Sequence, residues 1–476
     1  MQALETTLRQ VSPRYTRPPT PAVSTLIHGS ILALWLLLFL RAFGAHGVLA
    51  WSVGVIYVLY DTALLIFTFL ATLPLLRKPI PAVATSGPAP RLGVLIAAHN
   101  EAAVLPAAIA ALRQGHDRPE EIVIVDDGST DRTARVLAEF GLTPPPLGGM
   151  ARARDLVWLR LPHGGKARAL NRALAMVETD IVLTVDADTH LAPGAIAAMR
   201  RAFAANPRLV AATGILMPVC GPGAMGRVLQ WFQAHEYLRN FLSRAAWAGQ
   251  DGLLLISGAF AGFRRQALIA VGGFDPDCLV EDYELIHRLR RHAVARGLGW
   301  TTTVLGDAHA TTEAPSTIPA FLRQRRRWFG GFLQTQFWYR DMVGNPTYGH
   351  LGTRMLPVKA ADTLQPVYGL TAIFLFFWFL FTGHATWLTA IGAVIGAKLL
   401  FDFAFYLWSV SLYRRWVGQS GQVTLGSALL CALLEPFSFQ ILRHLGAALG
   451  WVSLLQRQRH WGSQPRQTGV LSLGAD

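Results

Sequence analysis

Apolar residues in this sequence occur in long runs towards both ends and in short runs in between. The long runs cover residues 24–40, 48–76, 367–381 and 385–407. The first two are each long enough to cross about 30 Å of hydrocarbon as a helix, and the last two form a second pair. The pattern therefore predicts two pairs of membrane-spanning helices that flank a middle segment of different character.

Basic residues at the ends of these runs predict how the helices are oriented. Arg77 and Lys78 close the first pair, and Arg414 and Arg415 close the second. Since Lys and Arg are enriched in cytoplasmic loops, both pairs are expected to begin and end inside the cell.

A further apolar run covers residues 425–455 and is interrupted by Glu435, Pro436, Arg443 and His444. As a single span it would place the basic C-terminal tail outside the cell. We favour a re-entrant or interfacial pair of helices bent at Pro436, because this arrangement keeps the tail inside.

Between the two membrane blocks, short apolar segments alternate with helical ones. Strands are expected at 92–97, 121–125, 157–161 and 181–185, and helices at 101–113, 130–139 and 166–177. This alternation is typical of βαβ units and predicts a parallel sheet. The glycine-rich fingerprint of dinucleotide-binding domains does not follow the first strand, which disfavours that class.

The composition agrees with a soluble domain joined to membrane helices, since 52% of the residues are hydrophobic and 15% are charged. Lys and Arg flanking the spans, attracted to anionic lipid, explain the net charge of +14. Nucleic acid is not expected as a partner, because no basic and aromatic binding module occurs. Cys220, Cys278 and Cys431 lie far apart, which excludes a disulfide framework or zinc knuckle and suits a reducing cytoplasm.

Two acids one residue apart follow the expected strand at 181–185. At the end of a strand, residues i and i+2 point the same way, so Asp186 and Asp188 should present two carboxylates to one point. Mg²⁺ and Mn²⁺ prefer such oxygen ligands and often share them with a phosphate. The alternative is a plain acidic turn after a core strand.

Polar pairs also follow two other expected strands. Asn100-Glu101 comes after the first strand and Asp126-Asp127 after the second. Ligands of parallel α/β sheets bind beyond the carboxyl ends of the strands, so these residues are candidates for the same site. For Asp126-Asp127 the alternative is a turn that caps the next helix.

The acids occur in a recognisable order along the chain. They are Asp126-Asp127, Asp186 and Asp188, and Asp282, followed by Gln324-x-x-Arg327-Trp328. This order resembles the D, DxD, D, QxxRW signature of the membrane-embedded family 2 glycosyltransferases, which include cellulose, chitin, hyaluronan and poly-N-acetylglucosamine synthases. The resemblance runs from residue 94 to about 331. Supporting stretches are 98–102, 164–171, 272–274 and, in the tail, Trp461-Gly462 and 466–469.

The resemblance implies an α/β fold of the GT-A type, Rossmann-like with a mainly parallel sheet, inserted as a cytoplasmic domain between two α-helical transmembrane blocks. The expected segments are a basic disordered arm (1–23), a transmembrane hairpin (24–78), a linker (79–90), the GT-A domain with interfacial helices (91–345), a second transmembrane block (346–456) and a basic cytoplasmic tail (457–476).

The resemblance also assigns roles at the catalytic centre. Asp282, next to Glu281, is expected to be the general base that takes the proton from the acceptor hydroxyl. Gln324, Arg327 and Trp328 would line the acceptor and diphosphate sites, with Arg327 suited to phosphate and Trp328 to sugar stacking. The neighbouring Arg325 and Arg326 are expected to face lipid headgroups or solvent. The alternative for this whole cluster is a basic interfacial helix.

On the donor side, the implied nucleotide-sugar contacts are Asn100, Glu101, Asp126 or Asp127, Lys166 and Asp186. Lys166 follows two glycines and suits a phosphate or base contact, and the alternative is a solvated lysine at a helix start. Asp186 and Asp188 would hold Mg²⁺ or Mn²⁺ against the diphosphate, with Asp188 as the more direct ligand.

The resemblance thus implies an inverting, metal-dependent enzyme of the inner membrane, with several spans, that moves a sugar from a UDP-sugar to a growing β-linked polysaccharide. QxxRW implies processivity. The alternative is a non-processive enzyme with a lipid-linked acceptor. The expected partners are the UDP-sugar, a glycan or lipid-linked acceptor, the lipid bilayer and an accessory export subunit. The donor sugar stays open.

Overall fold

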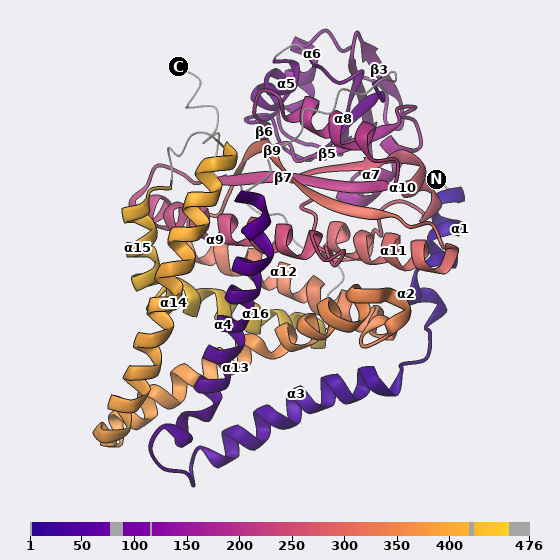
Figure 1. Cartoon of the computed structure of the whole chain (residues 1–476). Coiled ribbons are helices and arrows are strands. Elements are labelled where there is room, and N and C mark those ends of the chain that lie inside the picture. Colours follow the sequence, from indigo (N-terminus) through magenta and orange to yellow (C-terminus); the bar gives the residue numbers. More distant parts are fainter. Residues whose placement is uncertain (1, 77–88, 115–116, 418–422, 457–476) are drawn as a thin grey trace.

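The computed structural model describes residues 2–76, 89–114, 117–417 and 423–456, and Figure 1 shows an α/β domain above a group of long helices. Most of the expected linker at 79–90 and the whole expected tail at 457–476 lie outside the described residues, and so do the two tail motifs.

Four parallel strands form the part of the sheet that the sequence pattern predicted. In the order β4-β2-β1-β5 they are Leu156–Leu161, Glu121–Asp127, Leu92–Ala98 and Ile181–Val185. The helices between them are α5 (Leu105–Arg113), α6 (Thr133–Glu139) and α7 (Lys166–Leu174). β1, β2 and β5 are buried almost throughout, which is why they read as continuous apolar runs.

The rest of the sheet is mixed, which the sequence pattern did not reveal. β8 (Phe260–Arg264) pairs antiparallel with β5 and with β7 (Leu209–Val219), and β7 pairs parallel with β9 (Thr301–Glu313). The edge strands β3 (Met150–Ala153) and β6 (Thr189–Leu191) pair antiparallel with β4 and β9. β9 is largely half-buried and rich in Thr, so it lacks the apolar run that marks a central strand.

Several helices cover the sheet or separate it from the long helices below. α8 (Ala195–Ala205) and α10 (Arg265–Ala270) lie against the α/β domain, whereas α9 (Ala224–Ala248) and α12 (Ile318–Trp338) run between the sheet and the lower helices (Figure 1). α9 contacts β7 and β9 on one side and the apolar helix α4 on the other. It is therefore a packed helix at the boundary of the two parts.

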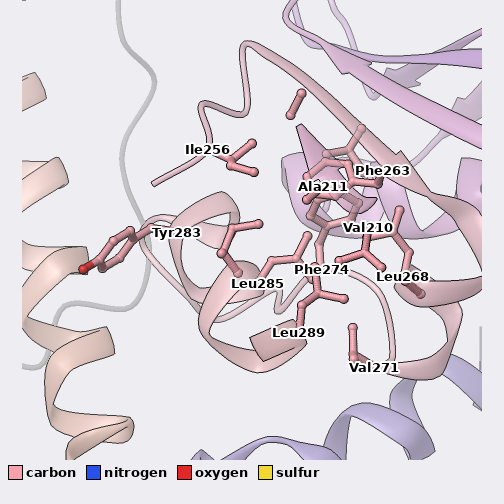
Figure 2. Packing of buried hydrophobic residues seen from close by; sticks show 14 of the residues in the cluster. Val210, Ala211, Ile256, Phe263, Leu268, Val271, Phe274, Tyr283, Leu285 and Leu289 are labelled. Atoms are coloured by element: carbon pink, nitrogen blue, oxygen red, sulfur yellow. The ribbon is translucent and has the colours of Figure 1, made fainter. Parts of the chain in front are cut away.

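A continuous apolar core fixes α11 (Glu281–Arg296) beneath the sheet. Figure 2 shows Leu285 and Leu289 of this helix close to Phe274, and all three belong to one buried cluster. Fully burying such a side chain contributes roughly 1.5–3 kcal/mol. The helix that begins beside the predicted base Asp282 therefore has a well-anchored position.

The apolar helices agree with the four predicted spans. Within the described residues, four helical stretches are long and apolar enough to cross a membrane: Ala22–Arg41, Gly47–Leu76, Leu351–Phe381 and Thr386–Arg415. A fifth element, Leu425–Phe437 followed by Phe439–Leu455, is bent by 50°, as expected for a pair of helices broken near Pro436.

These stretches are built from the following elements: α3 (Ala22–Arg41), η1 (Gly47–Trp51), α4 (Ser52–Thr72), η2 (Leu73–Leu76), η5 (Leu351–Met355), α13 (Leu356–Phe381), α14 (Ala385–Val417), α15 (Leu425–Leu434), η6 (Glu435–Phe437) and α16 (Phe439–Leu455). The short turns η3 (Arg340–Met342) and η4 (Pro346–Tyr348) precede η5. α13 begins before the predicted apolar run at 367–381. The apolar pattern did not reveal its first turns, because they carry the polar residues Lys359 and Asp362.

The expectation of a disordered N-terminal arm was wrong for residues 2–16. They form two short helices, α1 (Gln2–Val11) and α2 (Pro13–Thr16), which lie beside α10 and α11 at the right of Figure 1. Leu4 and Leu8, one helical turn apart, are buried against the α/β domain. The proline-rich composition suggested disorder, but this apolar pair gives α1 a buried face.

Candidate active site

A cavity of about 1930 Å³ opens at the carboxyl ends of β1, β2 and β5 and extends to α9, α12 and the apolar helices α4, α13 and α16. Of the residues predicted from the sequence, its lining includes Asn100, Glu101, Asp127, Lys166, Asp186, Asp188, Glu281, Asp282, Gln324, Arg327 and Trp328. Residues from distant parts of the chain are thus brought together in one cavity, and Asp126 lies behind it.

At the end of β5, Asp186 is held by a basic residue from α7. Lys166 Nζ lies 2.5 Å from Asp186 Oδ1 and 3.6 Å from Glu281 Oε1. Desolvation would lower the pKa of Lys166, but the two carboxylates outweigh it and raise this pKa, so the ammonium stays charged. Lys166 therefore links Asp186, on the predicted donor side of the cavity, to Glu281, the residue before the predicted base.

Asp188 is held by β6 and β9. Its carbonyl accepts a hydrogen bond from Glu313 N (3.3 Å), and the Thr312 hydroxyl lies 3.4 Å from Asp188 Oδ1. Asp186 and Asp188 both line the cavity. Their carboxylate oxygens are the hard donors that Mg²⁺ and Mn²⁺ require, so this pair fits a divalent cation.

Asp126 and Asp127 have different surroundings although they are adjacent. Asp126 is 1% exposed, and its Oδ1 accepts a hydrogen bond from Ser129 N (2.8 Å), as in a turn that follows a strand. Asp127 faces the cavity, and its two carboxylate oxygens accept from Gly164 N (2.8 Å) and Gly165 N (2.9 Å). Asp127 thereby fixes the loop that precedes Lys166.

Two histidines flank Asp127. The rings of His99 and His163 lie 4.3 Å apart, and each Nδ1 lies within 3.1 Å of the Asp127 carbonyl oxygen. Potential ligand atoms of His99, Asp127 and His163 all lie within 4.8 Å of one another, so this trio has the spacing of a metal site. The hydrogen bonds to Asp127 account for its geometry without an ion.

Asn100 shapes the loop after β1. Its φ of 60° is in the left-handed region, which Asn tolerates better than most residues. Its Oδ1 accepts hydrogen bonds from Thr130 N (2.8 Å) and Asp131 N (3.2 Å). Asn100 therefore joins the loop after β1 to the loop after β2 at the mouth of the cavity, while Glu101 is buried beside it.

The predicted base lies at the N-terminus of α11. Asp282 Oδ2 accepts a hydrogen bond from Gly258 N (2.6 Å), and its Oδ1 accepts from Tyr283 N (2.8 Å). Burial and the like charge of Asp282 raise the pKa of the neighbouring Glu281, although Lys166 opposes this shift. The two acids therefore differ: backbone donors hold Asp282, whereas Glu281 lies beside Lys166 and has a pKa raised by burial.

On α12, Gln324 and Arg327 face the cavity and carry polar atoms that lack a hydrogen-bond partner. These are Gln324 Oε1 and Arg327 Nε, both shielded from solvent. Buried polar atoms are normally satisfied, so groups of this kind in a cavity are available to a ligand.

Arg325 and Arg326 do not face lipid or solvent as the sequence suggested. Arg325 forms two hydrogen bonds to the buried Glu236 of α9 (2.9 and 2.7 Å), and its guanidinium lies 4.4 Å from the centroid of a Trp328 ring. Arg326 donates to Ser453 of α16 (2.6 Å). The expectation failed because α12 packs against α16 and because Arg325 reaches a buried acid on α9.

Sequence reasoning missed a row of cavity residues on α9. Tyr237, Asn240 and Arg244 recur at helical spacing and line the cavity. Arg244 Nε is buried without a hydrogen-bond partner, and burial lowers its pKa although the charge of Asp282 opposes this. The signal in the sequence is the helical spacing of these three polar residues within 224–248.

Beyond Trp328 the cavity continues between the apolar helices. Polar side chains predominate there: Asp61 of α4, Lys359, Asp362 and Gln365 of α13, and Arg443 and His444 of α16. Ionisable residues within apolar helices are expensive to retain and usually face an interior or a water-filled space.

Comparisons with known proteins assign the α/β domain to a family. Residues 93–272 match the family described as glycosyl transferase family 2. The chain is 29% identical over 274 residues to a beta-monoglucosyldiacylglycerol synthase of Synechocystis, covering 55% of this chain and 52% of that protein. It is 27% identical over 256 residues to a poly-beta-1,6-N-acetyl-D-glucosamine synthase of Staphylococcus epidermidis, covering 52% and 56%.

A solved structure extends the comparison of the fold. The mannosyltransferase PcManGT from Pyrobaculum calidifontis, in complex with GDP-Man and Mn²⁺, aligns with a TM-score of 0.55 at 21% identity, covering 82% of this chain and 99% of that chain. The fold is therefore that of GT-A glycosyltransferases. Residues 93–272 form a glycosyl transferase family 2 domain, which confirms the resemblance. The chain spans about half the length of the curated relatives.

Proposed function

We propose that this protein transfers a sugar from a nucleotide-diphosphate sugar, a UDP-sugar in the first instance, to a hydroxyl group of a growing β-linked glycan. One observation carries the proposal. A single cavity is lined by the acids after β1, β2 and β5, by Asp282 and Trp328, and by largely polar residues of the apolar helices α4, α13 and α16.

At the donor end, Asp186 and Asp188 would hold Mg²⁺ or Mn²⁺, which when bound neutralises the diphosphate of the donor. Lys166 contributes a further positive charge beside Asp186. Asn100, Glu101 and Asp127 border the part of the cavity left for the nucleoside. This end therefore suits an anionic ligand with a polar base.

At the centre, Asp282 would remove the proton from the acceptor hydroxyl as that oxygen attacks the anomeric carbon. The bond from the anomeric carbon to the diphosphate oxygen breaks on the opposite face, so an α-linked donor gives a β-linked product. Arg327 and Arg244 place two guanidinium groups in this cavity and would stabilise the departing negative charge.

At the acceptor end, Trp328 offers a flat ring on which a sugar can stack. The lining beyond it contains Asp362, Gln365 and His444, which suit sugar hydroxyls better than acyl chains. This polar lining supports a glycan acceptor and a route for the growing chain between the helices. A processive reaction would follow if that route retains the product.

A lipid-linked acceptor is the second candidate. The similarity to the monoglucosyldiacylglycerol synthase favours it. That match covers 55% of this chain, and the match to the poly-beta-1,6-N-acetyl-D-glucosamine synthase covers 52%. Under this alternative the apolar helices would present a lipid headgroup to Asp282. A product that carries one sugar on a lipid would support the lipid-linked acceptor. A ladder of oligosaccharides would support the growing glycan as the acceptor.

We also propose that the α/β domain lies on the cytoplasmic side of the inner membrane, where nucleotide sugars are made, and that an accessory subunit assists export. The basic pair Arg414-Arg415 at the end of the last long apolar helix supports this orientation. Cysteine-labelling from either side of the membrane tests it.

The proposal is tested by a donor screen on protein purified in detergent or in lipid nanodiscs. UDP-glucose, UDP-N-acetylglucosamine, UDP-galactose and GDP-mannose are supplied in turn, and nucleoside diphosphate release and product size are measured. We expect release with one donor, accompanied by a β-linked product. Absence of release with every donor, in the presence of Mg²⁺ or Mn²⁺, would refute the proposal.

A further inference from the structure

The N-terminal arm, residues 2–16, lies against the loop that leads to Asp282. Gly272, at the start of this loop, has a φ of +84°, and a Cβ placed on it would lie 2.3 Å from the backbone nitrogen of Leu8. α1 therefore packs directly on the backbone at Gly272, where no other residue leaves room. The family 2 domain at 93–272 does not include the arm.

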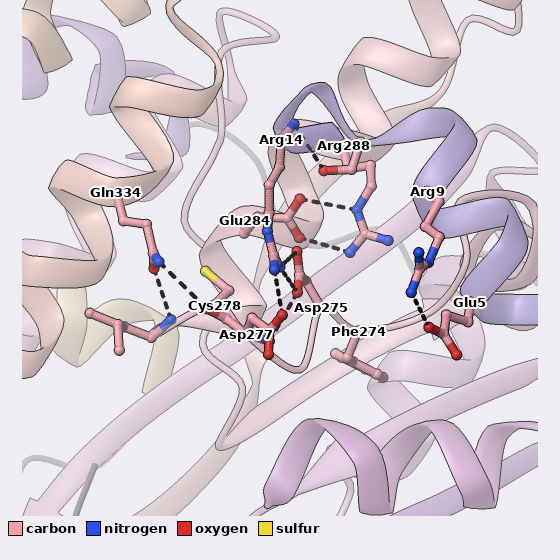
Figure 3. Close-up of polar contacts among 12 residues, drawn as sticks. Glu5, Arg9, Arg14, Phe274, Asp275, Asp277, Cys278, Glu284, Arg288 and Gln334 are labelled. Carbon is pink, nitrogen blue, oxygen red and sulfur yellow. Dashed lines mark hydrogen bonds and ion pairs between the residues drawn. The ribbon is translucent and has the colours of Figure 1, made fainter. Parts of the chain in front are cut away.

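An arginine of the arm binds two acids in the loop (Figure 3). Arg14 Nη1 donates to both carboxylate oxygens of Asp275, at 2.7 and 2.9 Å, and Nη2 pairs with Asp277. The Asp275 side chain is 0% exposed. Burial would lower the pKa of Arg14, but the charges of Asp275 and Asp277 outweigh it and raise this pKa. The guanidinium thus bridges the two acids through charge-assisted contacts, with one nitrogen on each acid.

The same loop is tied to α12 on its other side. Gln334 Oε1 accepts a hydrogen bond from Leu279 N (3.0 Å), and Gln334 Nε2 contacts the Asp277 carbonyl (3.4 Å). Val280 then packs flat against Gly331, where a Cβ would lie 2.4 Å from Val280 Cγ2. The loop is therefore held between the arm and α12.

The end of the loop determines where the predicted base lies. Val280 is followed by Glu281 and Asp282, and Asp282 Oδ2 accepts from Gly258 N at 2.6 Å. A shift of the loop would move the first turn of α11 relative to Gly258 and so alter the direction of the Asp282 carboxylate. Misplacement of a reacting group by about 1 Å can cost on the order of a hundredfold in rate.

We propose that Arg14 is a positioning residue for Asp282: by neutralising Asp275 and Asp277 it holds the loop 272–280 between the arm and α12. This inference rests on the proposed role of Asp282. Removing the guanidinium leaves Asp275 buried without its main counter-charge, and the loop must move to bring that carboxylate to water. Arg14 touches no part of the cavity lining, so its effect is on the loop.

Arg14→Ala tests the proposal, with Arg9→Ala as a matched control on the same arm. Arg9 forms an ion pair with Glu5 of its own helix, and both side chains are 62% exposed. Its guanidinium also lies 5.8 Å from the centroid of the Tyr15 ring, but it does not contact the loop 272–280 through any ion pair described for it. For Arg14→Ala we expect kcat to fall about tenfold or more, with the donor KM within about twofold of the wild type. Hydrogen exchange of residues 273–282 should become faster. Arg9→Ala should change neither quantity.

Wild-type kcat and wild-type exchange in Arg14→Ala would overturn the proposal, and so would an equal rise in exchange across the whole α/β domain. If Arg14→Ala does not fold, Arg14→Lys serves instead, because it keeps the charge but loses the second nitrogen that bridges to Asp277. We expect a fall in kcat of several-fold for Arg14→Lys, and an unchanged kcat would count against the proposal.

The exchange measurement separates this inference from the proposed function. It reports on the loop whether or not the protein turns over a sugar donor. If Asp282→Asn keeps full activity while Arg14→Ala still loosens residues 273–282, the assignment of the base fails but the role of the arm in fixing the loop stands.

Discussion

The guanidinium of Arg325 lies over the indole of Trp328, 4.4 Å from a ring centroid, and binds Glu236 of α9 through two hydrogen bonds. The ring proposed to stack on the acceptor sugar is thus backed by a buried ion pair. A cation over an aromatic face restricts the ring as well as stabilising it. The QxxRW segment is therefore joined to α9 through this ion pair and packs, with the rest of α12, against α16.

Loss of this ion pair should destabilise the fold. Arg325→Ala leaves Glu236, whose side chain is 3% exposed, with Arg443 as its remaining partner at 3.1 Å. We expect a loss of about 3 kcal/mol in the free energy of unfolding. The neighbouring Arg326→Ala, which removes a partly exposed contact, should cost less than about 1 kcal/mol. Equal losses in denaturant or thermal unfolding would contradict the structure.

Arg244 should be required for turnover. Its guanidinium carries a buried nitrogen without a partner in the same cavity as Asp282. Removal of a preorganised charge at the reacting centre typically costs on the order of a hundredfold in kcat, and we expect Arg244→Ala to lose that much. Arg227→Ala is the control on the same helix, because Arg227 bonds the Pro222 carbonyl at the exposed start of α9. A wild-type kcat in Arg244→Ala would remove this residue from the mechanism.

Chelation should abolish activity. Asp186 and Asp188 offer oxygen donors in one cavity, so EDTA is expected to stop nucleoside diphosphate release and added Mg²⁺ or Mn²⁺ to restore it. Asp188→Asn should lower the rate and raise the metal concentration needed for half-maximal activity. His163→Gln, which alters the His99–Asp127–His163 trio, should leave that concentration unchanged. Full activity in EDTA would show that the acids serve another purpose.

Acid should destabilise the protein through His287 of α11. Burial lowers the pKa of His287 from 6.5 to about 4. The hydrogen bond to the Tyr283 carbonyl raises this pKa, whereas the charge of Lys359 lowers it further. The unfolded state binds the proton more readily than the folded state. The contribution of neutral His287 to the free energy of unfolding is therefore fully present above pH 6.5 and is lost as the pH falls towards 4. Between pH 7 and pH 5 this loss is about 2 kcal/mol.

His287→Phe keeps an aromatic ring between Tyr283 and Tyr339 but cannot take up a proton. The melting temperature of the wild type should therefore fall more steeply than that of His287→Phe as the pH is lowered from 7 to 5. Parallel pH curves for the two proteins would refute this assignment.

Local pattern was enough to predict the elements with a strong apolar signal. The strand Ile181–Val185 has the predicted bounds, and the apolar helices coincide with the predicted spans. The candidate residues could also be found, since acids directly after buried strands must lie at one edge of a parallel sheet. The twelve candidate positions were recognisable for this reason and through the order of the family's signature, and their roles stay predictions.

The rest depended on contacts between distant segments. Nothing near Arg325 in the sequence indicates that Glu236 lies opposite it, and nothing near Arg14 indicates Asp275. β9 was missed because a half-buried strand with many Thr residues lacks an apolar run. In each case the stabilising partner comes from another element, which hydrophobic periodicity does not report.

The role of Asp282 is the central claim, and turnover of Asp282→Asn with the accepted donor tests it most directly. The amide retains the size of the side chain and can still accept from Gly258 N, so donor binding should be preserved. We predict that nucleoside diphosphate release falls by about a hundredfold or more at an unchanged donor KM, since the amide cannot take up the acceptor proton. Release at the wild-type rate would contradict the account.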